Sequence, residues 1–142
     1  VELAGFAEVL NRPLGKRLVL ECPVGLAMET DAVLLRRVLL NMLFNAFEAT
    51  PSGGQVRFTV VAAAGMLVFS VTNAALISDE TRARLFQPDN SRRGYGHGLG
   101  LYSIKLLGEK YLGGRISCLS ESAKGTVFTA EFPVRAFVSS CA

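Results

Sequence analysis

The chain has 142 residues, which is enough for one domain with a substantial apolar core. Half of the residues are apolar, which excludes a disordered chain, and a net charge of +3 is too small to argue for a nucleic-acid partner. The three cysteines, Cys22, Cys118 and Cys141, match neither a zinc spacing nor a disulfide framework. We therefore expect a reducing, cytoplasmic compartment.

The sequence contains no stretch that is typical of a membrane helix or a signal peptide. Its most apolar stretch, residues 60–71, is interrupted by Gly65 and is shorter than the ~20 residues that a membrane helix needs. The chain begins with Val1 rather than Met, so we expect it to be a piece of a longer protein. That parent could be membrane-anchored, although we expect no membrane insertion of this piece.

The first third of the chain predicts a strand and then a long helix. Residues 1–10 are weakly helical, residues 17–22 alternate as a strand, and a short extended piece follows around residues 27–29. Asp31 is a candidate N-cap for a helix whose apolar residues recur at helical spacing. The turn Pro51-Ser-Gly-Gly54 ends that helix.

The remainder predicts two hairpins with helices between them. Residues 55–63 and 66–73 form the first hairpin, and the sequence Ser78-Asp-Glu begins a short helix that ends near Phe86. The later elements are a loop over 87–96, a helix over 98–112 closed by Gly113-Gly114, a hairpin of 115–120 with 126–132, and a tail after Pro133. This order predicts a two-layer α/β sandwich, with helices on one face of a mixed sheet.

Three polar side chains lie on one stripe of the long predicted helix. Asn41, Asn45 and Glu48 are spaced i, i+4 and i+7, so they share a face that borders the apolar stripe and should be partly buried. Buried polar groups need partners, which could be a loop, water or a ligand. Two asparagines and a glutamate together favour a ligand, because an amide oxygen is suited to Mg²⁺ bound with substrate phosphates.

Alternating glycines mark a second candidate site. Gly94, Gly96, Gly98 and Gly100 lie at the start of a predicted helix. Glycine lets the backbone approach a phosphate closely, and a helix N-terminus offers free N–H groups. The loop does not follow a strand directly, so it is neither a Rossmann fingerprint nor a Walker loop, and a flexible surface loop is the alternative.

Taken together, these motifs resemble the ATP-binding catalytic domain of bacterial sensor histidine kinases, in the GHKL ATPase superfamily. The resemblance covers residues 31–133 and rests on Asn41-x-x-x-Asn45-Ala-x-Glu48-Ala (N box), Leu85-Phe86-Gln-Pro88 (F box), Gly96-x-Gly98-Leu99-Gly100-Leu101 (second glycine box), Gly113-Gly114-Arg-Ile, and Gly125 to Pro133 (last hairpin). It implies a Bergerat-type fold with a domain core over 31–134, preceded by a segment 1–30 and followed by a tail 135–142.

The resemblance also implies roles for individual residues. Asn45 would bind a Mg²⁺ ion that bridges the phosphates, and Asn41 beside it would complete the catalytic pair. The residues that would contact ATP are Asn45, Glu48, Asn73, Phe86, Arg93, Gly96, Gly98, Leu99, Gly100 and Leu101. Of these, Arg93 is either a phosphate contact or a solvated charge of the lid over 87–97.

One stretch departs from the family pattern. The family's first glycine box has an Asp that accepts a hydrogen bond from adenine, followed by two glycines. Here Asn73, Ala75 and Ile77 stand at those positions. An asparagine still accepts through its oxygen, but without the charge, so we expect weakened or altered nucleotide binding.

Two functions remain open. The first is a histidine kinase catalytic domain that transfers the γ-phosphoryl group of Mg-ATP to a histidine on a dimerisation domain absent from this chain, with a response regulator as a further partner. The second is a degenerate module of the same fold that binds a response regulator or another partner without productive use of ATP. His97 lies inside the glycine loop, so the piece alone should not autophosphorylate. Gyrase-type hydrolysis is disfavoured because Asn41 stands where those ATPases carry a glutamate base.

Overall fold

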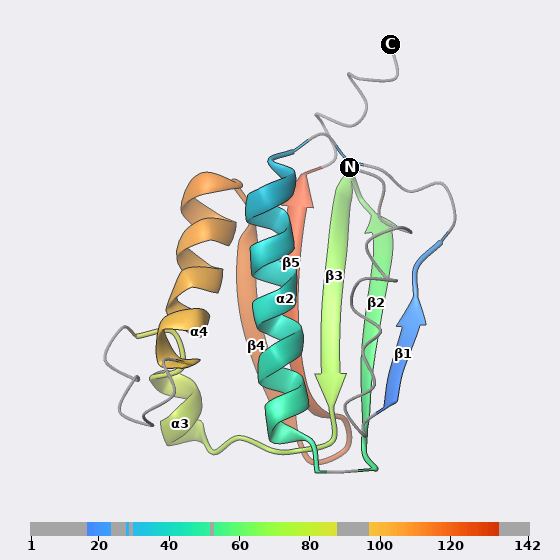
Figure 1. Cartoon of the computed structure of the whole chain (residues 1–142), viewed down its shortest axis with the longest axis vertical. Helices are drawn as coiled ribbons and strands as arrows, with labels where there is room; N and C mark the ends of the chain where they lie inside the picture. The colour runs from blue at the N-terminus through green and yellow to red at the C-terminus, as the bar shows by residue number, and fades with distance from the viewer. Residues whose placement is uncertain (1–16, 24–27, 29, 52, 88–96, 134–142) are drawn as a thin grey trace.

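Five strands form one mixed sheet in the order β1-β2-β3-β5-β4 (Figure 1). The computed structural model describes residues 17–23, 28, 30–51, 53–87 and 97–133, with only the backbone of Arg17 and of residues 97–100. Only the β1–β2 pair is parallel among these strands. The strands are β1 (Arg17–Glu21), β2 (Gln55–Ala63), β3 (Met66–Asn73), β4 (Arg115–Glu121) and β5 (Gly125–Pro133).

The helices form the second layer. In Figure 1, α2 and α4 run side by side across one face of the sheet. The helical elements are α2 (Ala32–Ala49), α3 (Asp79–Ala83), α4 (His97–Lys105) and the π-helix η2 (Leu106–Tyr111). The predicted two-layer α/β sandwich is therefore confirmed, as are both hairpins. No helix in the described part of the chain is long and apolar enough to cross a membrane.

The long helix α2 begins and ends where the sequence predicts. The side chain of Asp31 accepts hydrogen bonds from the N–H groups of Val33 and Leu34, at 3.0 and 3.1 Å. This N-cap satisfies two of the N–H groups that the first helical turn leaves unpaired. The helix buries seven side chains against the sheet: Leu35, Val38, Leu39, Met42, Leu43, Ala46 and Phe47.

Strand β3 carries the centre of the core. Its side chains alternate between partly exposed and buried, so every second residue faces the helices. Phe69 is fully buried and packs edge-on against Phe132 of β5, with ring centroids 5.8 Å apart. The same alternation puts Asn73, the last residue of β3, on the buried face below α2. The helix-covered face of the sheet thus carries a buried polar residue at the end of β3.

The helix predicted over 98–112 begins one residue earlier, at His97, and changes at Leu106 into the wider π-helix η2. Gly108 lies against β4 so closely that a Cβ there would be 2.6 Å from Ile116 Cδ1. The Glu109 carboxylate accepts from the Ile116 N–H at 3.0 Å and lies 3.3 Å from Lys105 Nζ. The wider turn therefore coincides with a tight contact between helix and strand that hydropathy alone does not predict.

Two free thiols lie in the described part of the chain, Cys22 and Cys118. Burial raises the pKa of both, and the pKa of Cys118 reaches about 11 although nearby Arg82 lowers it. Cys118 is therefore protonated at neutral pH and packs, partly buried, against the apolar core. The predicted helix over 1–10, almost all of the loop over 87–96 and the tail after Pro133 lie outside the described residues.

Candidate functional site

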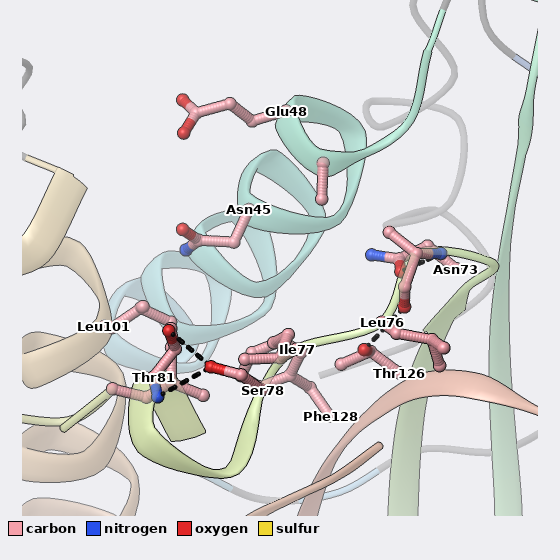
Figure 2. A pocket seen from close by; sticks show the side chains of 13 residues that line it. Asn45, Glu48, Asn73, Leu76, Ile77, Ser78, Thr81, Leu101, Thr126 and Phe128 are labelled. Atoms are coloured by element: carbon pink, nitrogen blue, oxygen red, sulfur yellow. Dashed lines mark hydrogen bonds between the residues drawn. The ribbon is translucent and has the colours of Figure 1, made fainter. Parts of the chain in front are cut away.

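A pocket of about 330 Å³ opens between α2, α4 and the segment that joins β3 to α3 (Figure 2). The residues that line it come from all of these elements and from β5: Asn45, Glu48, Ala49, Asn73, Ala75, Leu76, Ile77, Ser78, Thr81, Leu85, Leu101, Thr126 and Phe128. Four of the residues predicted from the sequence, Asn45, Glu48, Asn73 and Leu101, are thus brought together in its wall. The volume is of the size that small-molecule sites occupy.

Asn45 projects from the C-terminal half of α2 into this pocket. Its amide nitrogen Nδ2 donates to the backbone oxygen of Asn41, one turn earlier, at 2.7 Å. This bond orients the side chain and leaves the amide oxygen Oδ1 available to a ligand. Asn41 itself is half-buried and does not line the pocket, so its contribution in this structure is the carbonyl that holds Asn45.

Glu48 extends from the same side of α2 as Asn45 (Figure 2). We predicted that it would be partly buried together with the asparagines, and this prediction is wrong because the residue is exposed. Glu48 stands in the last turn of α2, at the mouth of the pocket, where its carboxylate reaches solvent.

Asn73 also lines the pocket and is buried, with a residue exposure of 4%. Its oxygen Oδ1 accepts from the N–H of Ala75 at 3.1 Å, and its Nδ2 donates to the Ala46 carbonyl of α2 at 3.4 Å. The side chain therefore connects the end of β3 to α2. It also fixes the start of the segment in which alanine and isoleucine stand where relatives are expected to have glycines.

A chain of hydrogen bonds holds the rest of that segment. The Ile77 N–H donates to Ser120 Oγ at 2.9 Å, Ser120 Oγ lies 3.1 Å from Thr126 Oγ1, and Thr126 Oγ1 donates to the Ala75 carbonyl at 2.7 Å. Each hydroxyl has one hydrogen. Because Thr126 gives its hydrogen to Ala75, Ser120 must donate to Thr126. Each hydroxyl thus donates its one hydrogen within the pocket wall and keeps one lone pair.

The sheet register explains why these residues meet. Asn73 is directly opposite Thr126 across the β3–β5 pair, and Thr126 is directly opposite Ser120 across the β5–β4 pair. The three polar residues therefore form one row across three strands, on the face that the helices cover. Our reading of the sequence missed Ser120 and Thr126, although their pairing across a short turn is a typical cross-strand Ser/Thr contact.

Phe86 and the glycine-box residues are the remaining predicted site residues. Phe86 packs edge-on against Phe128, with centroids 6.3 Å apart, and Lys105 Nζ lies 5.3 Å from its ring centre. Phe86 is therefore placed behind Phe128, which does line the pocket. Gly98, Leu99 and Gly100 belong to the first turn of α4, whereas Arg93 and Gly96 lie outside the described residues.

The donor set limits which metal the pocket could hold. The described residues contain no group of three His, Cys, Asp or Glu side chains that could bind a metal ion by themselves. A transition-metal site built from protein ligands is therefore not formed by these residues. The single amide oxygen of Asn45 fits Mg²⁺, which takes its remaining ligands from water and substrate phosphates.

Comparison with known proteins places this geometry among kinases. The family described as histidine kinase-, DNA gyrase B-, and HSP90-like ATPase matches residues 30–136. The adaptive-response sensory kinase SasA of Synechococcus sp. is 35% identical over 107 residues, which are 70% of this chain and 28% of that protein. The histidine protein kinase DivJ of Caulobacter vibrioides is 31% identical over 118 residues, which are 79% of this chain and 20% of that protein.

The chain is also similar in structure to solved histidine kinase domains. The catalytic domain of the histidine kinase ThkA superimposes with a TM-score of 0.74 at 28% identity, covering 93% of this chain and 88% of that one. A structure of ThkA in complex with the response regulator TrrA matches with a TM-score of 0.73 at 26% identity, covering 95% of this chain and 39% of that one. The chain thus spans most of a catalytic domain but less than a third of the two curated relatives.

Proposed function

Because the chain belongs to the histidine kinase-, DNA gyrase B-, and HSP90-like ATPase family, we propose that its pocket binds Mg-ATP for transfer of the γ-phosphoryl group to a histidine. The acceptor would lie on a dimerisation domain of the parent protein, and a response regulator would receive the phosphoryl group from it. The observation that carries the proposal is that Asn45, with a free amide oxygen, and the buried Asn73 line the same pocket. The domain core would span residues 31–134.

Each end of the pocket would hold one part of the nucleotide. Asn45 Oδ1 would be a ligand of Mg²⁺, which supplies charge neutralisation of the phosphates when it is bound. The first turn of α4, with Gly98 and Leu99, has N–H groups without a partner inside the helix, and these would face phosphate oxygens. Asn73 would contact the base, and Leu101 would cover the ligand from α4. The residues would thus act by positioning and charge stabilisation, as is usual in phosphoryl transfer.

One observation supports the alternative, a partner-binding module that makes no productive use of ATP. Ala75 and Ile77 add side chains to the pocket wall where the family is expected to have glycines, and Leu76 between them is 59% exposed. An exposed apolar side chain beside a partly filled pocket would suit a protein partner. The alternative predicts a folded domain without affinity for ATP.

Phosphotransfer in the whole parent protein tests the proposal. We expect that the parent, incubated with Mg²⁺ and ATP labelled in the γ position, acquires a label that is labile in acid and stable in alkali. Replacing the acceptor histidine with glutamine should remove the label and leave ATP binding intact. Binding of ATP without any labelled histidine would contradict the proposed transfer.

A further inference from the structure

Asn73 is held in one orientation by two backbone groups. The Ala75 N–H can only donate, so the side-chain atom that faces it must be the oxygen, at 3.1 Å. The Ala46 carbonyl can only accept, so the atom that faces it must be the nitrogen, at 3.4 Å. If the amide were turned over, Nδ2 would face the Ala75 N–H, which is also a donor, and Oδ1 would face the Ala46 carbonyl, which is also an acceptor. The two ends of the amide are therefore fixed in the wall of the pocket.

In this orientation, each end of the amide can still form one more hydrogen bond. Oδ1 has a second lone pair, and Nδ2 has a second hydrogen, and no other described residue forms a hydrogen bond with either. Asn73 thus offers the ligand both a donor and an acceptor.

The hydroxyls beside Asn73 cannot donate to a base. Ser120 and Thr126 each give their one hydrogen to the chain of hydrogen bonds that ends on the Ala75 carbonyl, so each can only accept from a ligand. Of these three side chains, only Asn73 therefore offers a donor to the base.

We propose that Asn73 lets the pocket take 6-oxopurine nucleotides, those of hypoxanthine and guanine, as well as adenine nucleotides. The inference rests on the proposed nucleotide-binding function. A carboxylate at this position can only accept, so it pairs with the 6-amino group of adenine and is repelled by a 6-oxo group. The Nδ2 of Asn73 donates to the 6-oxo group of a 6-oxopurine, whereas its Oδ1 accepts from the 6-amino group of adenine. Each base thus uses one end of the fixed amide.

Titration of ATP and of inosine triphosphate (ITP) into the same protein tests this inference. The two nucleotides differ only in the 6-substituent and in the N1 hydrogen that accompanies the oxo group. We expect dissociation constants within about fivefold of each other for the unaltered chain. In Asn73→Asp we expect ITP to bind at least about tenfold more weakly than ATP, because a buried carboxylate would face the 6-oxo group.

Ser117→Asp is the matched control, because it adds the same charge on an exposed residue of β4, on the face that the helices do not cover. It should leave the ATP-to-ITP ratio unchanged.

An unaltered chain that prefers ATP more than tenfold would overturn the inference and leave the proposed function standing. The same conclusion would follow if a folded Asn73→Asp kept the original ratio. If Asn73→Asp does not fold, the ratio of the ATP and ITP dissociation constants of the unaltered chain decides whether the inference holds. Binding of neither nucleotide by a folded sample would overturn the proposed function itself.

Discussion

Replacing Asn45 with alanine is expected to weaken Mg-dependent ATP binding by about 10- to 100-fold. The estimate corresponds to the loss of one interaction with a charged group, about 1.5–3 kcal/mol, at 1.4 kcal/mol for each factor of ten. The Asn45 side chain is held by the Asn41 carbonyl and has its Oδ1 directed into the pocket. Its removal takes away the amide oxygen that we assign to Mg²⁺ and leaves the apolar walls in place.

The fold should tolerate this substitution. Asn45 is half-buried, and its internal hydrogen bond runs back along its own helix, so alanine, the best helix former, should not destabilise α2. Phe44→Ala is a suitable control, because Phe44 is the neighbouring residue of α2, is 49% exposed and does not line the pocket. Calorimetric titration with and without Mg²⁺ should show loss only in Asn45→Ala. Equal, Mg-dependent affinity in both variants would remove Asn45 as the metal ligand.

Gly125→Ala is expected to cost about 2–5 kcal/mol of unfolding free energy and to damage the pocket. Gly125 has φ +81°, where a non-glycine residue costs about 1–2 kcal/mol. A Cβ there would also overlap the carbonyl oxygen of Asn73 and come within 2.9 Å of Ala74 Cα, which adds an overpacking cost of about 1–3 kcal/mol. To relieve this contact, the end of β3 must move away from β5, and Asn73 would move with it.

Gly65→Ala is the matched control for this prediction. Gly65 lies in the first hairpin at φ +78°, and a Cβ there would meet nothing within 4 Å. It therefore carries the conformational cost alone, about 1–2 kcal/mol. Urea unfolding should show the larger loss in Gly125→Ala, and ATP affinity should fall in that variant only. Equal losses of stability in both variants would show that the contact between Gly125 and Asn73 is not tight in solution.

Local sequence patterns predict most of the fold. Asp31 and Ser78 cap α2 and α3 as expected, since each accepts hydrogen bonds from the first turn that follows it. The bounds of β2 and β3 are those predicted from two mostly apolar stretches joined at the Ala64-Gly65 turn. These features depend on residues close together in the chain, so periodicity and turn chemistry determine them.

Features that depend on contacts between distant segments could not be predicted. The π-helix at Leu106 coincides with the approach of Gly108 to β4, and the row of Asn73, Thr126 and Ser120 depends on the pairing of β3 with β5. That pairing joins strands about fifty residues apart, which no local pattern specifies. The motif pattern predicted Asn45 and Asn73 as site residues, but not that Asn73 is fixed by Ala75 and Ala46.

The most direct test of the central claim is calorimetric titration of ATP into this domain, with and without Mg²⁺. If Asn45 and Asn73 line a nucleotide site, binding will be saturable and will weaken when Mg²⁺ is removed. A folded sample that binds no ATP at millimolar concentration, with Mg²⁺ present, would contradict that claim and leave the fold as a partner-binding module.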